Sequence, residues 1–126
     1  MLKVTRLVPV ERTEIDTRRV HALLRDMGHH SAERLFGRAL DEIDDRLHAA
    51  ERAARRGDLR GTARITRQLA TVADAAGLTS VTRVSRMVAG AAESGDGPAV
   101  AATLSRLTRL ADGAVPAIGE AWAARI

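Results

Sequence analysis

Residues 57–78 read GDLRGTARITRQLATVADAAGL, and their pattern predicts one helix between two tight turns. Asp58 is expected to cap the start of this helix, and Gly77 is expected to end it. Apolar and polar residues recur in steps of three and four, which places them on opposite faces. The apolar face comprises Ile65, Leu69, Val72 and Ala76, and the polar face Arg60, Arg64, Arg67, Thr71 and Asp74. Such a helix buries one face in a core and exposes the other.

The segments on both sides have the same helical periodicity. Ser31 is expected to cap a long helix that ends at Gly57, with a buried stripe of Leu35, Phe36, Ala39, Leu40, Ile43, Leu47 and Ala50. Beyond Gly77, Thr79 or Ser80 is expected to cap a helix that buries Val81, Val84, Val88 and Ala91. After a turn at residues 94–97 and Pro98 in a first helical turn, the last helix buries Val100, Leu104, Leu107 and Ala111.

Short connections between long helices are typical of antiparallel neighbours. The sequence therefore predicts an all-α fold, an up-and-down antiparallel four-helix bundle over residues 31–117, within a single domain of 126 residues. An additional short helix is expected within 16–28, capped by Asp16, with Val20, Leu23, Leu24 and Met27 inward. Residues 1–15 are expected to form an extended arm whose apolar residues are Val4, Leu7, Val8 and Val10. Gly113 and Pro116 are expected to interrupt the last helix before a tail, 118–126, that contains Trp122.

Composition narrows the classes of function. The chain has no cysteine, which excludes disulfides and thiolate nucleophiles and favours a reducing, cytoplasmic location. No apolar stretch is long enough to span a bilayer, and Arg6 and Pro9 interrupt any run of signal-peptide length. A membrane partner is therefore not expected.

The basic residues are almost all arginine: 19 of the 20 are Arg, and the net charge is +4. Arginine is a fixed charge whose planar fork suits carboxylates and phosphates. Only 2% of the residues are aromatic, and 16 acidic residues lie among the arginines, which disfavours nucleic acid as the partner.

With Gly57-Asp58 before the central helix and Gly77-Leu78 after it, the segment from Leu35 to Ala117 resembles the histidine-containing phosphotransfer (HPt) domain of bacterial phosphorelays. Members of that family are four-helix bundles that relay a phosphoryl group between histidine kinases and response regulators. The resemblance places their phosphoacceptor histidine at Arg67, whether counted forward from Gly57 or backward from Gly77. Leu69 matches the leucine of the family motif.

The resemblance thus implies a domain that has kept the scaffold and lost the chemistry. Ala70 and Thr71 stand at the usual lysine and glycine positions of the motif. A guanidinium with a pKa above about 12 cannot serve as the phosphorylated nucleophile. What the resemblance implies is therefore a non-enzymatic adaptor without a cofactor, which docks a receiver domain or a histidine kinase in two-component signalling. The candidate partner-binding residues are Arg60, Arg64, Arg67, Gln68 and Thr71.

Other polar clusters predict no catalytic or metal site. His29 and His30 are adjacent in the sequence, and neighbouring histidines cannot easily bind the same metal ion. His21 and His48 are not followed by the Leu-Lys-Gly sequence of a relay site. The acidic pairs 41–42 and 44–45 consist of consecutive helix residues that point in different directions. Two alternatives remain open, a DNA-binding regulator that uses the basic helices and a structural homo-oligomer in which the arm and first helix bury against a second copy.

Overall fold

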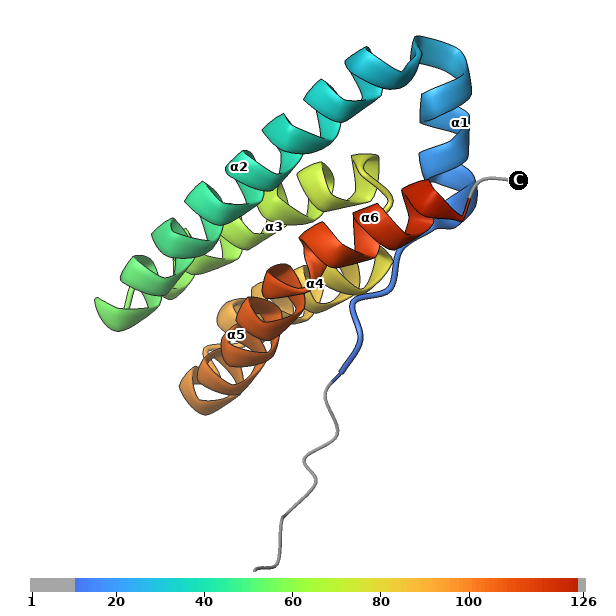
Figure 1. Ribbon diagram of the computed structural model, residues 1–126. Coiled ribbons are helices and arrows are strands. Elements are labelled where there is room, and N and C mark those ends of the chain that lie inside the picture. The colour runs from blue at the N-terminus through green and yellow to red at the C-terminus, as the bar shows by residue number, and fades with distance from the viewer. Residues whose placement is uncertain (1–10, 125–126) are drawn as a thin grey trace, which may run out of the picture.

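A computed structural model describes residues 11–124, and over this range the chain forms helices and no strands (Figure 1). In chain order the helices are α1 (Thr17–Met27), α2 (His29–Arg55), α3 (Leu59–Ala75), α4 (Thr79–Glu93), α5 (Gly97–Asp112) and α6 (Ala114–Ala123). The prediction of an all-α fold is confirmed.

The helices pack around α3, which contacts α2 on one side and α4 on the other. Helix α4 also packs on α5, and α5 touches α2. Helix α1 lies across one end of the long helices, where it contacts α2 and α6 (Figure 1). One face of α3 stays uncovered, and that face carries the polar residues predicted from the sequence, all of which are exposed.

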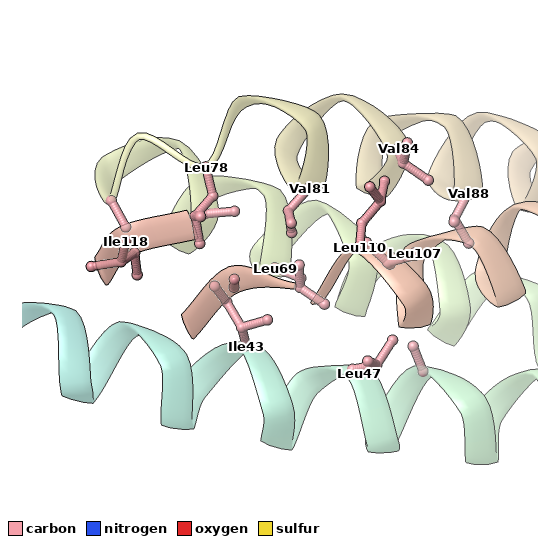
Figure 2. Packing of buried hydrophobic residues seen from close by; sticks show 14 of the residues in the cluster. Ile43, Leu47, Leu69, Leu78, Val81, Val84, Val88, Leu107, Leu110 and Ile118 are labelled. Carbon is pink, nitrogen blue, oxygen red and sulfur yellow. The ribbon is translucent and has the colours of Figure 1, made fainter. Parts of the chain in front are cut away.

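The core is aliphatic, as the sequence predicts. Figure 2 shows the predicted inward residues of α2, α3 and α4 packed together, among them Ile43, Leu47, Leu69, Val81 and Val88. Leu110 of α5 and Ile118 of α6 join the same cluster. In α1, Val20 and Leu24 are buried within the chain as predicted, whereas Met27, also expected to point inward, is 37% exposed at the end of the helix.

Small hydroxyl residues are also buried, which the sequence pattern did not indicate. Thr66 of α3 and Ser85 of α4 have no exposed surface. The Thr66 hydroxyl donates to the Thr62 carbonyl at 2.8 Å, and the Ser85 hydroxyl donates to the Val81 carbonyl at 2.7 Å. Because each donor is satisfied within its own helix, its burial leaves no unpaired group. Small side chains then allow neighbouring helices to approach closely.

The turns and caps around α3 follow the prediction. Gly57 and Gly77 have φ angles of 73° and 78°, a left-handed conformation that glycine adopts without strain. The Asp58 carboxylate accepts a hydrogen bond from the Gly61 backbone N–H at 2.8 Å. It packs so closely over Gly61 that a Cβ there would overlap it. These contacts fix where α3 starts, and so which of its residues face outward.

Two predictions about helix caps are wrong. Ser31 does not cap α2, because Gly28 separates α1 from α2 directly and α2 begins at His29. Neither Thr79 nor Ser80 caps α4, because Leu78 occupies the cap position and the buried Ser80 hydroxyl accepts instead from the Glu14 N–H.

The expected tail is helical as far as Ala123, as α6. Pro116 is compatible with it because it lies in the first turn, where its missing N–H has no partner to lose.

Residues 11–16, which include the described part of the arm, contain no helix and are held by polar contacts. The Thr13 hydroxyl donates to the Leu110 carbonyl at 2.6 Å, and the Asp16 N–H donates to the Gly77 carbonyl at 2.8 Å. Asp16 also caps α1, as predicted. Val4, Leu7, Val8 and Val10, expected to lie against a helix, fall outside the described residues.

The Glu11 carboxylate ties the arm to α5 and predicts a pH dependence of stability. It accepts from Arg106 Nε at 2.8 Å and Arg106 Nη2 at 2.6 Å. The hydrogen bond with Arg106 lowers the pKa of Glu11 below its ordinary value of 4.5. Because the pKa of Glu11 is lower in the folded than in the unfolded protein, the ionised carboxylate stabilises the fold at pH values above its unfolded-state pKa. This stabilisation is lost as the pH falls through the pKa of Glu11 in the folded protein.

We therefore expect Glu11→Gln to lose less stability than the parent protein when the pH falls from about 5 to about 3. Urea denaturation midpoints at several pH values measure this difference. Equal losses in the two proteins would contradict the assigned role of Glu11.

Candidate partner-binding surface

The uncovered face of α3 carries all five candidate residues predicted from the sequence. Burial of the opposite side of the helix, centred on Leu69, turns this face outward. The five exposed residues are Arg60, Arg64, Arg67, Gln68 and Thr71. Sequence periodicity therefore located the surface correctly, while their role in binding a partner stays a prediction.

The three arginines line the α3 side of one hollow between α3 and α4. Its volume is about 520 Å³, and Arg60, Arg64 and Arg67 line it together with Ala63, Ala92 and Glu93. The two alanines are buried, with 6% and 4% of their surfaces exposed. The hollow thus has small apolar side chains at its base and cationic groups at its rim. Such a surface suits an anionic group rather than a large apolar ligand.

Arg67 is paired with Glu93, the last residue of α4. Arg67 Nε donates to Glu93 Oε1 at 2.7 Å, and Arg67 Nη2 lies 2.5 Å from the same oxygen. The two side chains are 52% and 51% exposed, so water and salt screen this pair. This pair could not be predicted from the sequence, because its members are 26 positions apart and meet only through the packing of α3 on α4.

The other two candidates are set apart from this hollow. Thr71 faces α2, where it lines a separate hollow that includes Leu35 and Glu42. Its hydroxyl donates back to the Arg67 carbonyl at 3.2 Å. Gln68 is exposed on the same helix but does not line the arginine hollow. The structure therefore divides the predicted site into an arginine cluster and two polar residues beside it.

Three of the histidines make contacts within the fold. His21 Nε2 donates to the Ala121 carbonyl at 3.0 Å, and His48 Nδ1 donates to the Asp44 carbonyl at 2.9 Å. The His29 ring packs edge-on against Trp122, with ring centroids 4.7 Å apart. Among residues 11–124 no three histidine or acidic side chains are grouped so that they could hold a metal ion. The acidic residues at 41–42 and 44–45 are exposed along α2.

Comparison with known proteins assigns no function to this surface. No protein-family model, no curated protein and no solved structure matches the chain. In the part of the chain that the structure describes, no helix combines the length and apolar character needed to cross a membrane. The chemistry of the α3 surface is therefore the basis for a functional proposal.

Proposed function

We propose that this protein is an HPt-like adaptor in two-component phosphorelay signalling, which docks a receiver domain or a histidine kinase in the cytoplasm and transfers no phosphoryl group. In this proposal α2, α3, α4 and α5 form the family's up-and-down four-helix bundle, and α1 and α6 are additions at one end. The partner docks on the exposed face of α3, through Arg60, Arg64, Arg67, Gln68 and Thr71.

The observation that carries the proposal is the cluster of three arginines at the edge of one hollow on α3. The glycine turns at Gly57 and Gly77 flank the helix, and Arg67 is exposed between them. The sequence resemblance assigns the family's phosphoacceptor to this residue. Receiver domains have an acidic pocket around their phosphorylated aspartate. A cationic rim that meets such a pocket gains charge-assisted hydrogen bonds and faster association.

The absence of transfer follows from the chemistry of Arg67. Relay requires a side chain that accepts a phosphoryl group and releases it again, and a guanidinium that stays protonated has no free lone pair to attack phosphorus. The adaptor therefore competes with a true relay protein for the same partner. It needs no cofactor for this role.

A labelled mixture tests the proposal. The full chain is mixed with a receiver domain carrying a radiolabelled phosphoryl group and, separately, with a labelled histidine kinase, and both complex formation and label are followed. We expect a complex with one of these partners and no label on this chain. Label on His21 or His48, or no complex with any receiver or kinase of a representative panel, would overturn the proposal.

A further inference from the structure

The docking surface already holds a carboxylate. Glu93 occupies the edge of Arg67 formed by Nε and Nη2, which is the edge that pairs best with carboxylates and phosphates. Arg60 and Arg64, on the same rim, form no ion pair with any residue in the range 11–124. One of the three cations is therefore engaged, while the other two remain available to an incoming anion.

Helix stability does not explain the position of Glu93. It is the last residue of α4, where the helix dipole presents negative charge and disfavours an acidic side chain. Gly95, with a φ of 71°, then turns the chain toward α5. A cationic or neutral residue would suit this helix end better, and the contact that compensates Glu93 is its bond to Arg67.

We infer that Glu93 is an internal competitor for the docking site, whose carboxylate takes the place on Arg67 that a partner's carboxylate occupies in the complex. The inference rests on the proposed docking of an acidic receiver surface on α3. Docking then exchanges one carboxylate for another, since two carboxylates on the same edge would repel each other. The pair is half exposed and therefore weak, so a partner can displace it, but it lowers the affinity of every partner that uses Arg67.

The first test compares the affinities of full-length variants for a receiver domain. Glu93→Gln is expected to bind about two- to five-fold more tightly than the parent protein, as release of an exposed ion pair allows. Glu120→Gln makes the same charge change on α6, near the opposite end of the fold, and is expected to leave the affinity unchanged. In an Arg67→Ala background, Glu93→Gln is expected to have no effect.

A second measurement uses inorganic phosphate as a probe and needs no receiver. The NMR signal of the Arg67 Nε–H is followed while phosphate is added, and in Glu93→Gln it is expected to shift at a lower phosphate concentration than in the parent protein. Receiver binding that is the same with and without Glu93→Gln would overturn the inference alone. Absence of receiver binding by every variant would overturn the proposed function, and the phosphate titration would then decide whether Glu93 blocks Arg67.

Discussion

Replacing Leu69 by alanine is expected to lower the free energy of unfolding by about 3 kcal/mol. Leu69 lies at the middle of α3, on the side opposite the arginine rim, and none of its surface is exposed. Figure 2 shows its side chain within the packed cluster formed by α2, α4 and α5. Its truncation removes buried apolar surface and leaves a cavity that the rigid neighbouring helices can fill only in part.

Gln68→Ala is the matched control, because Gln68 is the neighbouring residue and its side chain is exposed. This substitution is expected to change the free energy of unfolding by less than about 0.5 kcal/mol. Urea denaturation followed by circular dichroism measures both variants. A Leu69→Ala protein that unfolds at the same urea concentration as Gln68→Ala would show that α3 is not the centre of the core.

The positions of the helices could be predicted because apolar spacing and turn residues agree along most of the chain. In α3, the exposed arginines and the buried Leu69 follow from one pattern of steps of three and four, and the cap follows from the aspartate at position 58. The candidate surface could be predicted for the same reason. Residues that share a helix face in the sequence also share it in the structure, and no tertiary contact was needed to find Arg60, Arg64 and Arg67.

The sequence could not show features that depend on contacts between distant segments. The Ser80 hydroxyl is taken by the arm residue Glu14, so it does not cap α4. Buried Thr66 and Ser85 read as polar in a hydropathy pattern, although their hydroxyls are satisfied within their own helices. The bond from Arg67 to Glu93 likewise requires the packing of α3 on α4, which periodicity alone does not define.

Reversing the charge of the arginine rim is expected to have the largest effect on docking. In the proposed complex, the variant that combines Arg60→Glu, Arg64→Glu and Arg67→Glu would replace three attractive contacts with an acidic receiver pocket by repulsive ones. Like charges brought together at an interface cost several kcal/mol, so the affinity is expected to fall at least about 100-fold. All three side chains are exposed, and the fold is expected to survive the change.

A control variant separates this effect from the change in net charge. Arg18 and Arg25 of α1 and Arg34 near the start of α2 are exposed and lie outside the hollow. Replacing all three by glutamate gives the same net charge as the rim variant. Its affinity for a receiver is expected to fall only through weaker long-range attraction, by less than about 10-fold at physiological salt.

Titration of one receiver domain with the parent protein, the rim variant and the control variant tests the α3 docking surface most directly. Binding is expected to be lost in the rim variant and largely retained in the control. Equal affinities of the two variants, or a rim variant that binds as well as the parent protein, would contradict docking through the arginines of α3.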